Sequence, residues 1–261
     1  NKPLCHLHTQ FNEALPYDTI DMDFMNENQS AHGDREYGHI VSRMGIERKV
    51  IVGHWASEKV QKQLGSWMRT AIGLIESSHI RVCRFGDNMN NVAVTEGDKV
   101  EAQIKFGWEI DHYCVNDLVE YVNAVSDTDV AALVEEYYSK YKIIDEGRDP
   151  EEFRRHVAVQ ARQEIGIEKF LVDNNYQAVV THFGMLGGLQ QLPGLAIQRL
   201  MEKGYGFGAE GDWKVAAMVR LMKLMTAGIK DAKGTSMMED YTYHLVPGEE
   251  GILQSHMLEV C

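Results

Sequence analysis

The spacing of apolar residues in the first hundred positions predicts alternating strands and helices. Residues 48–53 are a short β-branched run, typical of a buried strand, and residues 79–84 are a second one. Between them, apolar residues recur at helical spacing on one face: Val60, Leu64, Trp67, Met68, Ala71 and Ile75. We therefore predict a β–α–β unit over residues 48–84.

Residues 92–106 follow a different pattern. Four apolar residues (Val100, Ala102, Ile104 and Phe106) alternate with polar ones. A period of two is typical of a half-buried strand. The turn residues 96–98 precede this stretch, so we predict a hairpin that pairs it with residues 92–95.

The rest of the chain continues the alternation. Residues 115–172 are mostly helical in pattern, and Asp149 followed by Pro150 is a good helix start. Residues 176–181 form a buried-strand candidate, a helical stripe runs from Trp213 to Met225, and residues 235–261 resemble two strands. Such alternation favours an α/β fold built in layers.

Composition narrows the class of protein. A chain of 261 residues with 44% hydrophobic content can bury one or two cores. The net charge of −13 argues against nucleic acid and against anionic membrane surfaces as partners. No apolar run reaches the roughly 18 residues of a membrane-spanning helix. The scattered cysteines, Cys5, Cys83, Cys114 and Cys261, indicate reduced thiols and a cytoplasmic protein.

Both ends of the sequence are abrupt. It begins at Asn1, one residue before an apolar stretch, and stops at Cys261 within another. Natural termini are usually polar and frayed. We therefore expect a longer polypeptide of which this is a part.

Two glutamates and a histidine lie in distinctive local sequences. Glu210 is in GYGFGAEGDWK (204–214), Glu239 in GTSMMEDYTYH (234–244) and His256 in QSHMLEV (254–260). Two carboxylates and an imidazole suit Mn²⁺, Mg²⁺ or Co²⁺ better than a thiolate-binding metal. The three are too far apart in sequence for one helix face, so only the tertiary fold can bring them together.

The segment Gly206–Gly211 also matches the dinucleotide motif G-x-G-x-x-G. Residues 196–203 before it are helical rather than strand-like in pattern, and Glu210 and Asp212 would place negative charge beside a diphosphate. We prefer the interpretation that the glycines let the backbone bend sharply and present Glu210 at a sheet edge.

These segments resemble the L-arabinose isomerase family, and the resemblance covers the whole chain. Further matching motifs are DFMNENQSAHGDRE (23–36), RFGDNM (84–89), VAVTEGDK (92–99) and QLPGLA (191–196). The resemblance implies Rossmann-like parallel-sheet layers in three domains. Residues 1–80 would be the latter part of an N-terminal α/β domain, 81–230 a central α/β domain, and 231–261 the start of a C-terminal, mainly β domain.

The resemblance also implies an activity, the isomerisation of L-arabinose to L-ribulose, and of D-galactose to D-tagatose, through an enediol. Glu210 and Glu239 would be catalytic and, with His256, bind Mn²⁺, with Co²⁺ or Mg²⁺ as substitutes. Met89 and Phe183 would line the sugar pocket. Gln29 and His32 would reach the substrate from a neighbouring subunit of a trimer or hexamer.

Each of these side chains has a simpler explanation from local sequence alone. A glutamate such as Glu210 is usually a solvated surface charge, Gln29 and His32 fit a loop, and Met89 and Phe183 fit a core. His182 and His244 lie beside the motifs, and neither is assigned a role.

The chain departs from the family pattern at three points. A fourth metal ligand, a histidine, would lie beyond residue 261, and Met185–Gly188 replaces a common Asp-Leu-His-Gly stretch. The family's N-terminal strands, which contribute sugar-contacting residues across a subunit interface, are also missing from this sequence. With three protein ligands, we expect the chain to bind Mn²⁺ at least tenfold more weakly than a full-length relative. The alternatives are a sugar-binding or assembly module without turnover and, more remotely, a nucleotide-dependent oxidoreductase.

Overall fold

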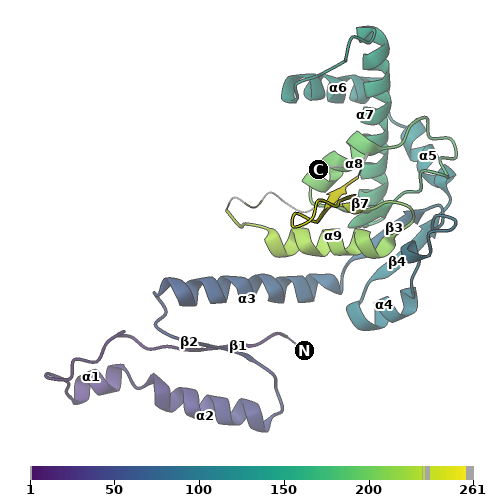
Figure 1. The fold of residues 1–261 in the computed structure, drawn as a ribbon. Coiled ribbons are helices and arrows are strands. Elements are labelled where there is room, and N and C mark those ends of the chain that lie inside the picture. The colour runs from purple at the N-terminus through teal and green to yellow at the C-terminus, as the bar shows by residue number, and fades with distance from the viewer. Residues whose placement is uncertain (1, 231, 233–235, 257–261) are drawn as a thin grey trace. The chain divides into compact units, whose positions relative to one another are not determined.

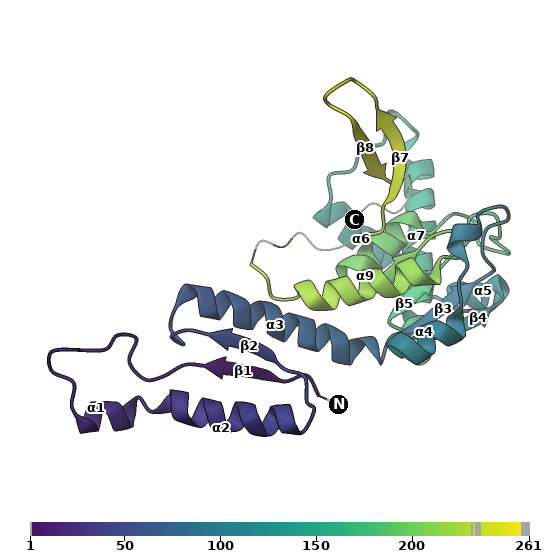
Figure 2. The same ribbon diagram turned by 60° about the horizontal axis from the view of Figure 1, so that its bottom comes forward.

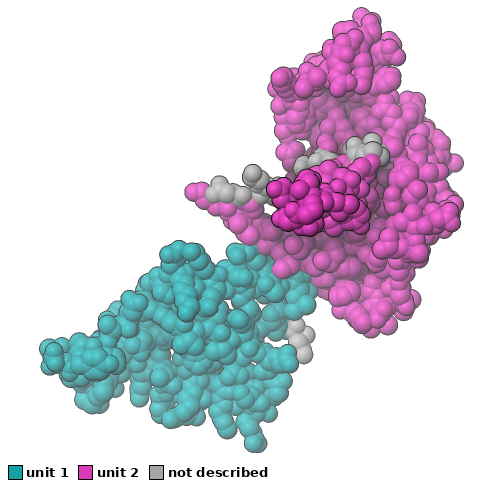
Figure 3. Space-filling view, viewed as in Figure 1, with its two compact units in different colours: residues 1–75 teal, residues 76–261 magenta. Residues whose placement is uncertain are grey.

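The computed structural model describes residues 2–230, 232 and 236–256. The chain divides into two compact units, residues 1–75 and 76–261 (Figure 3). Each unit has its own sheet and is described by itself.

Unit 1 is a two-stranded parallel sheet flanked by helices. Strand β1 (Cys5–His8) pairs with β2 (Lys49–Val52), with Leu7 opposite Ile51. The sheet lies between α2 (Ser30–Arg43) and α3 (Glu58–Ser77), and α1 (Met22–Glu27) precedes α2 (Figures 1 and 2). Asp21 begins α1 by accepting a hydrogen bond from the Phe24 N–H at 2.8 Å, as N-cap residues do.

Unit 2 is built on a four-stranded parallel sheet. Its strands are β3 (Arg81–Phe85), β4 (Glu109–Tyr113), β5 (Ala178–Val180) and β6 (Gly206–Gly208), in the order β4-β3-β5-β6. One row across the sheet joins Ile110, Val82, Ala178 and Gly206. All four strands run in parallel, which requires helices to cover the faces of the sheet.

The remaining elements of unit 2 are mostly helices. They are the 3-10 helix η1 (Ala93–Thr95), α4 (Lys99–Phe106), α5 (Val115–Asn123), α6 (Asp127–Lys140), α7 (Pro150–Asp173), α8 (Gly194–Glu202) and α9 (Trp213–Thr226). Strands β7 (Glu239–His244) and β8 (Gly251–Ser255) form an antiparallel hairpin that projects from this body (Figure 2). No described helix is both long and apolar enough to cross a membrane.

Alternate side chains of the parallel strands enter two different cores. Cys83, Phe85 and Val179 pack with residues of α5, α7 and α8. Val82, Ala178 and Val180 pack with residues of α4 and α9 on the other side. This alternation is the period of a strand buried on both faces, and it makes the unit a three-layer α/β sandwich.

Most of the predicted elements are confirmed, including the parallel-sheet α/β class. Helices occupy much of 115–172 and all of 213–225, and two strands follow within 235–256. Asp149 does begin α7, because its side chain accepts a hydrogen bond from the Glu152 N–H at 2.8 Å. Cys5, Cys83 and Cys114 are free thiols, and Cys261 lies outside the described residues. The division into three domains stays a prediction.

The predicted β–α–β unit over residues 48–84 is wrong. Its strands and helix exist as β2, α3 and β3, but β2 pairs with β1, whereas β3 pairs with β4 and β5. Periodicity identifies an element without identifying its partner. The two strands belong to the sheets of two different units.

The predicted hairpin over residues 92–106 is also wrong. Residues 99–106 form α4, whose first turn is capped by the Asp98 side chain accepting from the Glu101 N–H at 2.9 Å. Gly107, with φ of 77°, ends the helix in the left-handed conformation. Of the four alternating apolar residues only Ala102 is buried, so the alternation did not report a buried strand face.

Candidate functional site

Three loops meet at the carboxyl ends of β3, β5 and β6. The Gly211 N–H donates to the carbonyl oxygen of Thr181 at 3.1 Å, and the Met89 N–H donates to that of Glu210 at 2.9 Å. These two bonds join the loop after β6 to the loops after β5 and β3. In parallel α/β sheets this edge is where ligands bind.

Glu210 has a backbone conformation that is uncommon for a residue with a side chain. Its φ is 58°, in the left-handed region. Next to it, Gly211 has φ of 86°, and a Cβ there would lie 2.4 Å from the Asp87 carbonyl oxygen. Asp212 then starts α9 by accepting from the Lys214 and Val215 N–H groups at 2.9 and 3.1 Å. The Glu-Gly-Asp sequence thus turns the chain from strand to helix and holds Glu210 at the turn.

The glycines before Glu210 serve packing. A Cβ on Gly206 would lie 2.1 Å from the Ala216 carbonyl oxygen, and one on Gly208 would lie 2.0 Å from that of Asp212. Both contacts bring β6 against α9 and its N-cap. Close packing of α9 therefore accounts for these two glycines without a bound diphosphate, and the bend at residue 210 is made by Glu210 and Gly211.

The C-terminal hairpin carries the second carboxylate and the imidazole. Glu239 begins β7 and pairs with Ser255 of β8, so His256 follows directly after its cross-strand neighbour. His256 Nε2 lies 3.9 Å from Glu239 Oε2, and the His256 side chain is buried. The pairing of β7 with β8 therefore brings Glu239 and His256 close together in space.

The structure brings Glu210 into electrostatic contact with both of these residues. Burial raises the pKa of Glu210, and the Glu239 charge raises it further, whereas His256 and His182 act in the opposite direction. The ligand atoms of the three are not all within 4.8 Å of one another. A cation bound by all three would have to draw the hairpin and the β6 loop together.

His182 is a site residue to which the sequence assigned no role. It lies two residues after the end of β5, is 6% exposed, and its Nδ1 accepts a hydrogen bond from the Gly184 N–H at 2.9 Å. Its Nε2 is buried and has no hydrogen-bond partner among the described residues. Because Nδ1 is an acceptor, a neutral His182 carries its proton on Nε2. Its position at the carboxyl end of a predicted buried strand was the available signal.

The remaining predicted residues fall in two places. Met89 and Phe183 lie in the loops after β3 and β5, and Phe183 is 39% exposed, so it is not a core residue. Gln29 and His32 belong to unit 1, where Gln29 is the N-cap of α2 and His32 lies in its first turn. Both are exposed. Their supply to the site of a neighbouring subunit stays a prediction.

The parallel sheet and the carboxylates at its edge define unit 2 as an α/β protein with a candidate site for a divalent cation and a polar ligand. Family models narrow this class. The model for the L-arabinose isomerase central domain matches residues 81–228, that for the N-terminal domain residues 1–79, and that for the C-terminal domain residues 234–261. The chain belongs to the L-arabinose isomerase family.

Curated relatives agree along the whole sequence. The chain is 59% identical to an L-arabinose isomerase of Geobacillus stearothermophilus over 260 residues, and 58% identical to those of Halalkalibacterium halodurans and Bacillus subtilis. These alignments cover 100% of the chain and 52% of each relative. The chain spans about half the length of the curated relatives it matches.

Proposed function

We propose that the protein is a Mn²⁺-dependent isomerase that interconverts L-arabinose and L-ribulose, and also D-galactose and D-tagatose. The observation that carries this proposal is the convergence of Glu210, Glu239 and a buried imidazole at the carboxyl edge of a parallel sheet. Membership in the L-arabinose isomerase family supplies the substrate class.

The side chains fit a hard divalent cation. The set consists of carboxylate oxygens and imidazole nitrogen, without thiolate, which suits Mn²⁺, with Co²⁺ or Mg²⁺ as substitutes. The charge of Glu239 raises the pKa of Glu210, so the two carboxylates repel each other without a cation between them. When bound, the cation would supply Lewis-acid polarisation of the two reacting sugar oxygens.

The chain's own groups move the proton between C1 and C2 of the sugar. Such a step needs a base on one side and an acid on the other, with different proton affinities. Glu210 has a raised pKa because of its burial and of Glu239, so it holds a proton more readily than an ordinary glutamate. We assign proton transfer to the Glu210 and Glu239 pair, through an enediol, and leave the direction open.

His182 adds a hydrogen-bond donor to this assignment. Its Nε2–H is buried beside Glu210 and has no acceptor among the described residues. A buried donor without a partner costs stability in the free protein. A sugar hydroxyl bound next to His182 would accept this hydrogen bond and remove that cost. We infer that His182 orients the sugar relative to Glu210.

The decisive experiment measures ketose formation from L-arabinose by the full-length protein, after removal of metal with EDTA and after addition of Mn²⁺. We expect activity only with metal, and loss of activity in Glu239→Gln with an unchanged circular dichroism spectrum. Sugar binding without ketose formation in the metal-loaded protein would instead establish the alternative, a binding or assembly module.

A mixing experiment tests the shared site. Full-length Glu210→Gln and His32→Ala variants, each inactive alone, are co-expressed as mixed oligomers. If His32 acts on the neighbouring subunit's Glu210, some sites combine two intact residues and activity returns. If both residues act within one subunit, mixing restores nothing.

A further inference from the structure

Two histidines and an aspartate gather in unit 1, outside the site described above. His6 Nε2 lies 2.9 Å from Asp34 Oδ1, and His8 Nδ1 lies 3.2 Å from Asp34 Oδ2. One ligand atom from each of the three lies within 4.8 Å of the other two, and no other set of three such residues in the described part of the chain meets this limit. We propose that His6, His8 and Asp34 form a second divalent-metal site.

The secondary structure creates this cluster. His6 and His8 are two residues apart in β1 and their rings stack at 3.9 Å between centroids. Residues two apart in a strand point to the same face, and the helix α2 on that face supplies Asp34. The three ligands therefore come from a strand and a helix, which hold them more firmly than a loop would.

The distances fit a metal shell. Ligands at about 2.05 Å from a metal are separated by about 2.9 Å in octahedral and about 3.3 Å in tetrahedral geometry, given the usual Zn–N and Zn–O lengths. The two nitrogen–oxygen separations, each to a different oxygen of Asp34, are close to these values. Two imidazoles and one carboxylate favour Zn²⁺ or Co²⁺ over the all-oxygen ions Mg²⁺ and Ca²⁺.

The alternative is a purely structural hydrogen-bond network, in which Asp34 pairs with His6 Nε2 and holds the buried ring in place. His6 is 6% exposed, and its Nδ1 is buried without a hydrogen-bond partner in the described part of the chain. Among the residues that the structure describes, Asp34 is the polar partner of this imidazole, through His6 Nε2. Asp34 and His8 are 20% and 31% exposed, so the cluster lies at the rim of the core and a cation can reach it from solvent.

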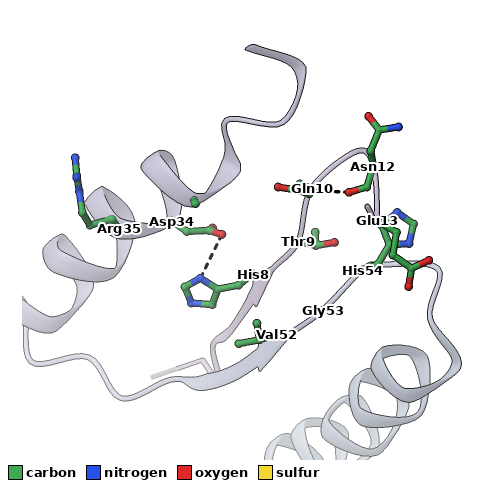
Figure 4. Close-up of a pocket in the computed structure, with 11 residues that line it drawn as sticks. His8, Thr9, Gln10, Asn12, Glu13, Asp34, Arg35, Val52, Gly53 and His54 are labelled. Carbon is green, nitrogen blue, oxygen red and sulfur yellow. Dashed lines mark hydrogen bonds and ion pairs between the residues drawn. The ribbon is translucent and has the colours of Figure 1, made fainter. Parts of the chain in front are cut away.

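The cluster also opens onto a cavity, as a site that exchanges water or ligand requires. His8 and Asp34 form one side of a pocket of about 510 Å³ (Figure 4). Thr9, Gln10, Asn12, Glu13 and His54 are among its other lining residues. With three protein ligands, a metal here would keep an open position, as catalytic rather than structural zinc sites do. The cavity is large enough for a small ligand.

The test titrates Zn²⁺ into the untagged chain carrying Glu239→Gln, which disables the site in unit 2. We expect one Zn²⁺ per chain by calorimetry. His8→Gln or Asp34→Asn in the same background should lower the affinity at least tenfold, as loss of a ligand does. His39 is an exposed histidine of α2, the helix that also carries Asp34. His39→Gln is therefore the matched control and should bind Zn²⁺ with unchanged affinity.

Histidine side-chain NMR covers the case in which a variant fails to fold. Zn²⁺ added to the Glu239→Gln chain should shift the ring signals of His6 and His8 and leave those of His39 in place. Absence of Zn²⁺ binding in that chain would overturn the proposal and leave a hydrogen-bond network only. Equal Zn²⁺ affinity in folded His8→Gln, Asp34→Asn and His39→Gln chains would overturn it as well.

Discussion

Two glutamates of unit 2, the buried Glu164 and the half-buried Glu210, have opposite surroundings. Glu164 of α7 is 1% exposed, and both of its oxygens are paired. Arg199 Nε donates to it at 2.7 Å, Lys203 Nζ at 3.1 Å and the Tyr137 hydroxyl at 2.5 Å. Glu210 instead faces a second carboxylate, and burial and that charge together raise its pKa.

This difference separates a structural charge from the one for which we propose a function. A buried carboxylate with partners on each oxygen lowers the energy of one conformation and has no capacity left for a ligand. Glu210 and Glu239 retain that capacity, and the folded protein bears the cost of holding them together. The predictions below test this contrast, beginning with the largest effect.

The largest effect is expected at the paired glutamate. Arg199→Met leaves Glu164 buried with two of its three donors and also removes the partner of Glu136. Breaking a buried ion pair on one side typically costs about 3–5 kcal/mol. Urea unfolding of the chain should show a loss of that size. Lys140→Met, whose partner Glu202 is at the surface, is the control and should cost far less, because solvent screens an exposed ion pair. Equal losses in the two variants would contradict the contrast.

How far the sequence predicts this contrast depends on the kind of information each residue carries. The family resemblance of their local segments made Glu210, Glu239 and His256 candidates, and periodicity identified most helices and strands. Neither the motifs nor the periodicity shows which strands pair with each other. For this reason β2 was predicted to pair with β3, although it pairs with β1. The partners of Glu164 lie 27 to 39 residues away in the sequence. His182 was assigned no role because the sequence does not show that its Nδ1 accepts from Gly184 while its buried Nε2 has no partner among the described residues.

A second prediction concerns the unpaired glutamate. Full-length Glu210→Gln should lose on the order of a hundredfold or more in isomerase activity, because the amide neither binds the cation well nor accepts the proton. Its free energy of unfolding without metal should be unchanged or higher, since the repulsion from Glu239 is removed. Ketose assays and urea unfolding measure the two quantities. A variant that keeps more than half of the parental rate would refute the assignment, and Glu202→Gln is the surface control.

A third prediction places His182 on the functional side of the contrast. His182→Ala in the full-length protein should lower kcat/KM about tenfold, the loss expected for one buried hydrogen bond to the sugar. His182→Gln should recover part of this loss, because its amide nitrogen can replace the Nε2–H donor. A structural role alone would lower the stability of both variants and leave kcat/KM unchanged in the protein that remains folded.

The smallest effect is expected at Glu96, a glutamate between the two extremes. Burial raises the pKa of Glu96, but the Gly97 N–H, Trp213 and Arg84 outweigh it and lower the pKa to about 2. A lowered pKa in the folded state means that the contribution of Glu96 to stability is present above about pH 4.5 and is lost as the pH falls towards 2. Because the side chain is 40% exposed, solvent screening limits this contribution to about 1 kcal/mol.

Glu96→Gln should therefore be less stable than the parent at pH 6 and nearly equal to it at pH 2.5. Thermal unfolding across this range, with the exposed Glu101→Gln as control, measures the difference. If the difference in stability between the parent and Glu96→Gln stays the same at low pH, Glu96 acts through packing. Its charge would then contribute nothing comparable to that of the paired Glu164.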